Sequence, residues 1–143
     1  PPDFLDFLRL LNREKVKYLL IGGYAVAHYG YVRATGDMDV FVDRTAENAT
    51  RLSAACRLFG LGDEWEATDF LEVGVILRFG LPPLRLEILN QISGVTFEEC
   101  FYQHSTVDVE DVTIPVISLE RLLKNKEASG RDKDLLDLRR LQP

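Results

Sequence analysis

The sequence predicts a single α/β (α+β) domain, in which a mixed β-sheet is flanked by helices and followed by C-terminal helices. Helix-like and strand-like patterns alternate along the first half of the chain, and two strand-like runs then follow each other as a hairpin, a combination typical of mixed sheets. The length of 143 residues is close to the commonest domain size, and no repeat, low-complexity tract or linker divides it. We therefore expect one domain over residues 1–143, with a core at about 16–117 and a C-terminal helical segment at 118–141.

The first elements follow from the spacing of apolar residues. From Asp3 to Asn12 they recur at helical spacing, which predicts an amphipathic helix. Val16 to Ile21 is almost wholly apolar and predicts a buried strand. Gly22-Gly23 ends this run, and Tyr24 to Tyr29 predicts a short helix that stops at a glycine. Asp37 to Val42 has the two-residue alternation of a strand.

The later elements are predicted from the same two periods. Helical spacing predicts helices over Thr45 to Phe59, Thr96 to Phe101, Ser118 to Ala128, and from Asp132 onward. Alternation predicts strands over Glu72 to Phe79, Leu84 to Leu89, and one or two within Ser105 to Ile117. On the last helix, we expect three leucines to pack inward: Leu135, Leu138 and Leu141.

The composition restricts the classes of function. A net charge of −6 argues against broad, sequence-independent binding to nucleic acid, because such binding needs a basic surface. No apolar stretch approaches the roughly 18–20 residues that span a bilayer, and the first residues resemble neither a signal nor a transit peptide. Cys56 and Cys100 lack metal-ligand spacing and are expected to be free thiols. These features favour a cytoplasmic protein with no membrane partner.

A glycine pair and two aspartates are the strongest functional signal. Asp37 and Asp39 are two residues apart on a predicted strand, so their side chains point to the same face. Carboxylates this close repel each other unless a cation lies between them or one keeps its proton. Mg²⁺ takes oxygen ligands of this kind, usually together with phosphates. Because Gly22-Gly23 lies just before a helix, backbone N–H groups there can approach a phosphate chain. The combination favours transfer of a phosphoryl or nucleotidyl group.

Each of these residues also has an interpretation without function. Asp37 and Asp39 could be solvated carboxylates on an exposed strand face, and Gly22-Gly23 could be a plain tight turn. Glu87, on the polar face of its predicted strand, could form an ion pair with Arg85 in solvent.

Five motifs follow one another between about residues 16 and 141. They are Gly-Gly-Tyr-Ala-Val-Ala at 22–27, Arg-x-Thr-x-Asp-x-Asp at 33–39, Leu-Glu-Ile-Leu at 86–89, Ile-Ser-Leu-Glu at 117–120 and Lys-x-x-x-Gly-Arg-x-Lys-Asp-Leu at 126–135. The ordered set resembles the nucleotidyltransferase fold superfamily, the polymerase β-like group. Within it, the chain is similar to the small prokaryotic AbiEii-type and minimal nucleotidyltransferases, several of which are toxin–antitoxin components.

This resemblance implies a transfer of a nucleoside monophosphate from a nucleoside triphosphate, with ATP the expected donor, to an acceptor hydroxyl. Asp37, Asp39 and Glu87 would be the catalytic residues and would bind two Mg²⁺ or Mn²⁺ ions. The residues implied to bind the nucleotide are Gly22, Gly23, Arg33, Thr35, Lys126 and Arg131. For Lys126 and Arg131 the alternative is that they are helix-end cations near a C-terminal dipole, and for Arg33 that it is an ordinary surface residue.

The acceptor is expected to be a protein side chain, a tRNA end or a small molecule, because the acidic composition disfavours a long nucleic-acid template. A cognate partner protein, as in a toxin–antitoxin pair, fits the resemblance. The alternative is a catalytically degenerate nucleotide-binding or interaction protein of the same fold. It is supported by Gly23, where many relatives have Ser, and by Glu87, where many have Asp.

Overall fold

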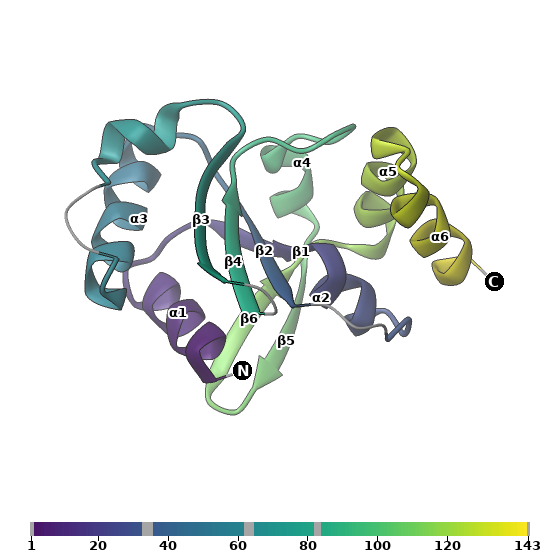
Figure 1. Ribbon diagram of the computed structural model, residues 1–143, viewed down its shortest axis with the longest axis horizontal. Helices are drawn as coiled ribbons and strands as arrows, with labels where there is room; N and C mark the ends of the chain where they lie inside the picture. Colours follow the sequence, from purple (N-terminus) through teal and green to yellow (C-terminus); the bar gives the residue numbers. More distant parts are fainter. Residues whose placement is uncertain (1, 33–35, 62–64, 82–83, 143) are drawn as a thin grey trace.

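The structure, a computed structural model, describes residues 2–32, 36–61, 65–81 and 84–142. It contains a six-stranded mixed sheet flanked by helices, which confirms the predicted fold class (Figure 1). The strands are β1 (Tyr18–Ile21), β2 (Asp37–Val42), β3 (Val75–Leu81), β4 (Leu84–Leu89), β5 (Ser105–Val109) and β6 (Val112–Val116). The helices are α1 (Pro2–Arg13), α2 (Gly22–His28), α3 (Ala46–Phe59), the 3₁₀ helix η1 (Ala67–Leu71), α4 (Phe97–Tyr102), α5 (Leu119–Ser129) and α6 (Asp132–Leu141).

The strands follow the order β3-β4-β2-β1-β6-β5 across the sheet. Strand β2 is parallel to β4, and β1 is parallel to β6, whereas the other neighbouring strands are antiparallel. Helices α1 and α3 lie together on one side of the molecule, and α5 and α6 lie at the opposite end (Figure 1). The sheet therefore separates a helix-covered face from a face that is left partly open.

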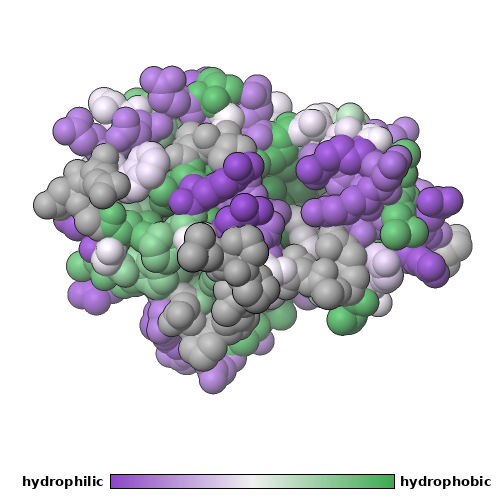
Figure 2. Space-filling view, viewed as in Figure 1, coloured by the Kyte–Doolittle hydropathy of each residue, from purple (hydrophilic) through white to green (hydrophobic). Residues whose placement is uncertain are grey.

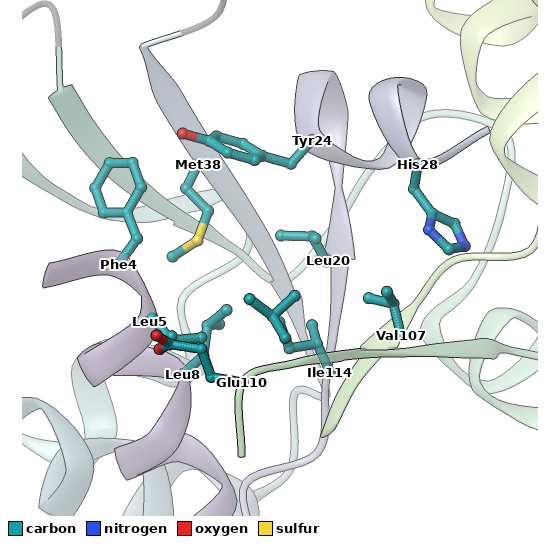
Figure 3. A pocket seen from close by; sticks show the side chains of 11 residues that line it. Phe4, Leu5, Leu8, Leu20, Tyr24, His28, Met38, Val107, Glu110 and Ile114 are labelled. Carbon is teal, nitrogen blue, oxygen red and sulfur yellow. The ribbon is translucent and has the colours of Figure 1, made fainter. Parts of the chain in front are cut away.

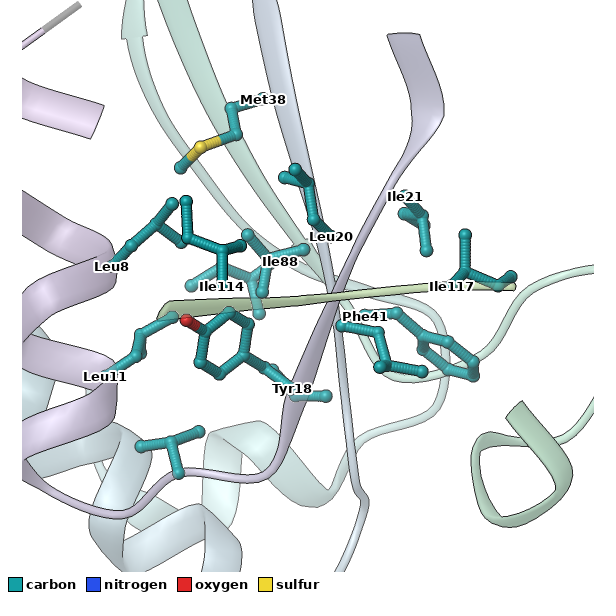
Figure 4. Packing of buried hydrophobic residues seen from close by; sticks show 14 of the residues in the cluster. Leu8, Leu11, Tyr18, Leu20, Ile21, Met38, Phe41, Ile88, Ile114 and Ile117 are labelled. Atoms are coloured by element: carbon teal, nitrogen blue, oxygen red, sulfur yellow. The ribbon is translucent and has the colours of Figure 1, made fainter. Parts of the chain in front are cut away.

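The main core lies on the face covered by α1. Met38 and Val40 of β2 are buried there with Ile88 of β4. Figure 4 shows Leu8 and Leu11 of α1 directed toward the sheet on this side. On the other face, the Phe41 ring packs edge-on against Phe97 of α4, with ring centroids 5.1 Å apart. Only part of that second face is thus covered by apolar packing.

Asn48 of α3 is a buried polar residue that holds the ends of two strands together. Its Oδ1 accepts a hydrogen bond from the Lys17 backbone N–H at 2.7 Å. Its Nδ2 donates to the backbone oxygens of Lys17 at 3.1 Å and Asp43 at 2.8 Å. Because Lys17 precedes β1 and Asp43 follows β2, this amide fixes α3 relative to both strands.

Most predicted elements are present, with shifted ends. Strand β1 begins at Tyr18, not at Val16, and α2 begins directly at Gly22. Strand β3 continues through residues 80–81, which were expected to belong to the hairpin connection, and η1 was not predicted. Cys56 and Cys100 are buried free thiols, as expected. Within the described ranges, no helix has both the length and the apolar character needed to cross a membrane.

The predicted inward face of α6 is confirmed at Leu141 and wrong at Leu135. Leu135 is 40% exposed, whereas Asp134, Asp137 and Leu141 are buried. Residues three, four and seven positions apart share one helix face, so the buried stripe consists of Asp134, Asp137 and Leu141. Its aspartates are buried because they bind a buried lysine of α5, Lys126.

We expect Asn48→Ala to lower the free energy of unfolding by about 1–3 kcal/mol, because backbone groups at two strand ends lose their buried partner. Urea unfolding measures this change. Thr50→Ala, on the exposed side of the same helix, is the matched control and should stay within about 0.5 kcal/mol of the parent. Equal effects of the two substitutions would contradict the role of Asn48.

Candidate active site

A polar cavity of about 490 Å³ opens on the partly uncovered face of the sheet. All the described site residues predicted from the sequence line it: Gly22, Gly23, Asp37, Asp39, Glu87, Lys126 and Arg131. Figure 2 shows strongly hydrophilic surface gathered in two groups, one over β3 and β4 and the other over α5 and α6. Segments distant in the sequence therefore meet at one charged cavity. The two other predicted residues, Arg33 and Thr35, lie outside the described residues.

The parallel pairing of β2 and β4 brings the acids together. In this register Asp39 is directly opposite Glu87, and Asp37 is opposite Arg85. The alternating residues of both strands, such as Met38 and Leu86, are buried on the far face. The acids are therefore held on one face by strands whose other face is fixed in the core.

The carboxyl groups of Asp39 and Glu87 form a hydrogen bond that depends on protonation. Burial, the charge of Glu87, a hydrogen bond with Glu87 and the charge of Asp37 together raise the pKa of Asp39 to about 7, while Lys133 opposes the shift. A hydrogen bond between two carboxyl groups requires one of them to be protonated. The Oδ1 atom of Asp39 is buried and has no hydrogen-bond partner in the described part of the chain. Such an orphaned hard oxygen, between acids that repel each other, is suited to a divalent cation.

Two arginines bind the flanking acids. Arg85 donates from Nη2 to Asp37 Oδ2 at 3.1 Å, and Arg78 of β3 donates from Nε to Glu87 Oε1 at 3.0 Å. The ion pair anticipated from the sequence, between Arg85 and Glu87, is thus replaced by two others. Among the described residues, no three acidic, imidazole or thiol side chains are already arranged as a metal-binding group. The donor chemistry fits a divalent ion, and the arginines occupy part of the carboxylate surface that such an ion would use.

Gly22 lies against Asp39 at the junction of β1 and α2. Its φ of +66° is in the left-handed region, which favours glycine. A Cβ atom built on Gly22 would overlap the Asp39 carboxylate. The first glycine of the pair is therefore required both by its backbone conformation and by the acid beside it.

Lys126 is held by a buried ion cluster. Its Nζ lies 3.1 Å from both Asp134 Oδ1 and Asp137 Oδ2. Ser129 donates from Oγ to Asp134 Oδ2 at 2.6 Å, and Arg131 donates from Nε to the same oxygen at 2.7 Å. Although burial opposes its ionisation, hydrogen bonds from Arg131, Ser129 and Lys126 lower the pKa of Asp134 below its usual range. The charged atoms of Lys126 and Arg131 thus contact α6, and their proposed contact with nucleotide stays a prediction.

Lys133, Arg78 and Arg85 line the cavity but were not among the predicted site residues. The Lys133 side chain is exposed, and its charge acts on Asp39. Within the described part of the chain, its ammonium forms no salt bridge. Sequence signals could have identified two of these residues. Lys133 lies in the last motif, directly before Asp134, and Arg85 lies on the same strand face as Glu87.

A second cavity, of about 560 Å³, lies between α1, α2 and the β5–β6 hairpin. It is mostly apolar, and Figure 3 shows Phe4, Tyr24 and Met38 around one part of it and His28 around another. None of the predicted site residues that the structure describes lines it. The chemistry of the chain is therefore concentrated in the smaller, polar cavity.

We expect Gly22→Ala to lower the free energy of unfolding by about 2–4 kcal/mol, because left-handed strain and displacement of Asp39 add together. Gly60→Ala is the matched control, since Gly60 also has a positive φ, +97°, and a Cβ there would meet nothing within 4 Å. A double-mutant cycle by urea unfolding measures the contact: combining Gly22→Ala with Asp39→Ala should recover part of the loss. Full additivity would contradict the close approach.

The raised pKa of Asp39 makes stability depend on pH. Its unfolded value is about 4, so the stabilising contribution of the protonated group is complete below about pH 4 and is lost as the pH rises through about 7. In EDTA, Asp39→Asn should therefore match the parent at pH 4 and exceed it by roughly 2–4 kcal/mol at pH 8. Denaturant unfolding between pH 4 and 8 measures the difference, with Asp108→Asn on exposed β5 as control. Parallel curves for Asp39→Asn and the parent would show an ordinary pKa.

Comparison with known proteins places this geometry in a family. Residues 2–142 match the family described as nucleotidyl transferase of unknown function (DUF2204). The chain is similar in fold to a "putative nucleotidyltransferase" from Thermotoga maritima, with a TM-score of 0.63, 19% identity, and 98% and 92% of the two chains covered. An antigenic nucleotidyltransferase-like protein from Paracoccidioides brasiliensis gives a TM-score of 0.50 at 16% identity, covering 94% of this chain and 71% of that one.

At these identities the two structures show a shared fold alone, and no protein of curated function matches the sequence. The predicted resemblance to the nucleotidyltransferase superfamily is confirmed. From the match over residues 2–142, the chain belongs to the family of nucleotidyl transferases of unknown function (DUF2204).

Proposed function

We propose that the protein transfers a nucleoside monophosphate from a nucleoside triphosphate, with ATP as the expected donor, to an acceptor hydroxyl, in a Mg²⁺- or Mn²⁺-dependent reaction. The observation that carries this proposal is the register of β2 and β4, which puts Asp39 beside Glu87 and opens both, with Asp37, into the cavity that Gly22 lines. Three acids lie together on one face of strands whose other face is buried in the core. Their mutual repulsion has an electrostatic cost that a divalent cation offsets.

In this reaction the acceptor hydroxyl loses its proton to water, its oxygen forms a bond to the α-phosphorus, the bond from that phosphorus to the bridging oxygen breaks, and pyrophosphate leaves. Bound divalent ions supply stabilisation of the charge on the entering and leaving oxygens. Asp37, Asp39 and Glu87 would provide the oxygen ligands, among them the buried Oδ1 of Asp39. Gly22 lies against Asp39, and Gly23 lines the same cavity, so a phosphate chain held at the acids would pass the backbone of both glycines.

Lys133 is the described cation best suited to phosphate, because its exposed ammonium has no carboxylate partner among the described residues. Lys126, in contrast, is 4% exposed and enclosed by two aspartates. We therefore assign Lys133 to direct phosphate contact, whereas Lys126 would act mainly by fixing α6 at the cavity edge. The acceptor is a protein side chain, a tRNA end or a small molecule, and a toxin–antitoxin role with a cognate partner fits the proposal.

The test is transfer of label. The protein is incubated with each α-³²P-labelled nucleoside triphosphate, Mg²⁺ and a cell extract, and labelled acceptors are separated on gels and by thin-layer chromatography. Asp37→Asn and Asp39→Asn should each lower labelling by about 100-fold or more, because each removes a charged ligand. Asp108→Asn, an exposed strand aspartate outside the cavity, is the control and should label as the parent does.

Two outcomes contradict the proposal. If no triphosphate labels any acceptor while the protein still binds triphosphate in a Mg²⁺-dependent way, the chain is the degenerate nucleotide-binding alternative. If labelling persists in both aspartate variants, the chemistry lies elsewhere in the molecule.

A further inference from the structure

The charged face of the sheet carries two arginines among its three acids. Arg85 is opposite Asp37 across the β2–β4 pair, and Arg78 is opposite Glu87 across the β3–β4 pair. Each guanidinium binds the acid beside it, at 3.1 Å and 3.0 Å. The result is an alternation of opposite charges on three neighbouring strands, all lining the same cavity.

This set of ion pairs is incomplete. The Oδ1 atom of Asp39 and the Nε atom of Arg85 are both buried, and neither has a hydrogen-bond partner among the described residues. A buried polar atom that is left unpaired destabilises the protein, because it has lost its hydrogen bonds to water. An arrangement that satisfies both atoms needs a further cation at the aspartate and a further hydrogen-bond acceptor at the arginine.

A divalent cation with a phosphate chain meets both needs at once. Guanidinium and metal ions compete for the same carboxylate oxygens, so a bound divalent ion releases the arginines. A released guanidinium presents a planar fork of N–H donors that matches phosphate oxygens. Arg78 is 58% exposed, so its side chain has room to change its partner, whereas Glu87, 14% exposed, is fixed.

Resting on the proposed function, we propose that Arg78 and Arg85 act as counterions of the acids in the metal-free protein and become the binding groups for the phosphates that leave as pyrophosphate once divalent cations bind. Cation and phosphate binding are then coupled, and the coupling is reciprocal. Arginines that served only as cross-strand ion pairs for the sheet would give no such exchange.

The test uses Arg78→Gln, Arg85→Gln and the double variant, with calorimetric titration of Mn²⁺ alone and of inorganic pyrophosphate at saturating Mg²⁺. We expect Mn²⁺ alone to bind about 3–10-fold tighter in the variants, because a competing cation is gone. Pyrophosphate with Mg²⁺ should bind about 10-fold weaker for each arginine removed. Arg51→Gln removes a comparable 2.6 Å ion pair with Glu47 outside the cavity and should change neither affinity.

Arg78→Lys and Arg85→Lys are conservative variants that test the same inference if the glutamine variants fail to fold. They keep the charge but lose the planar fork, so Mn²⁺ affinity should stay near the parent value while pyrophosphate binding weakens. Weaker or unchanged Mn²⁺ binding in the glutamine variants, or unchanged pyrophosphate binding in them, overturns the inference.

These readouts need no turnover, so the two proposals fail separately. Opposite shifts of the two affinities, without labelling of any acceptor, would sustain the role of the arginines and contradict the transfer reaction. If the parent protein labels an acceptor, but the Mn²⁺ and pyrophosphate affinities of the arginine variants do not shift in opposite directions, only the role of the arginines is overturned. A parent protein that binds neither Mn²⁺ nor pyrophosphate would overturn both.

Discussion

The parallel register of β2 with β4 sets Asp39 beside Glu87, and the rest of the cavity depends on how that like-charge contact is resolved. Two half-buried carboxyl groups side by side must share a proton or attract positive charge. Both solutions are present in the cavity. The raised pKa of Asp39 favours a shared proton, whereas the arginines beside Asp37 and Glu87 and the charge of Lys133 provide positive charge. The chemistry is therefore determined by strand pairing more than by any single side chain.

Rigidity at this cavity comes from the opposite face of the same strands. Met38 and Ile88 are almost completely buried, so neither strand can rotate or slip without moving core side chains into solvent. Phe41 adds a second fixed point, because its ring packs under α4 two residues beyond Asp39. The acids stay close together in spite of their repulsion because apolar packing on both sides of the sheet holds the strands that carry them.

Alternation and motif order predicted the acids and the fold because both depend on short periods that a sequence displays directly. To predict that Asp37 and Asp39 share a face, one strand was enough. To predict that Glu87 joins them, a second strand was needed whose polar face could be identified. The partners of Arg85 could not be predicted, because they depend on which strand lies beside β4. The inward position of Leu135 on α6 was predicted wrongly for a similar reason: Leu135 has the expected spacing, but the buried lysine opposite α6 favoured Asp134 and Asp137 at inward positions beside Leu141.

The Lys126 cluster has a consequence for how the C-terminal helices are attached. An apolar interface tolerates small sliding, because its free energy follows area rather than angle. A buried ammonium with carboxylates at 3.1 Å on both sides is satisfied in one arrangement only, although buried ion pairs add little net stability compared with apolar packing. The ion cluster thus fixes the orientation of α6 more than it stabilises the contact between α6 and the rest of the protein. Because Lys126, Arg131 and Lys133 all line the cavity, a substitution that moves α6 would alter the distance between Lys133 and the sheet without any contact with the acids.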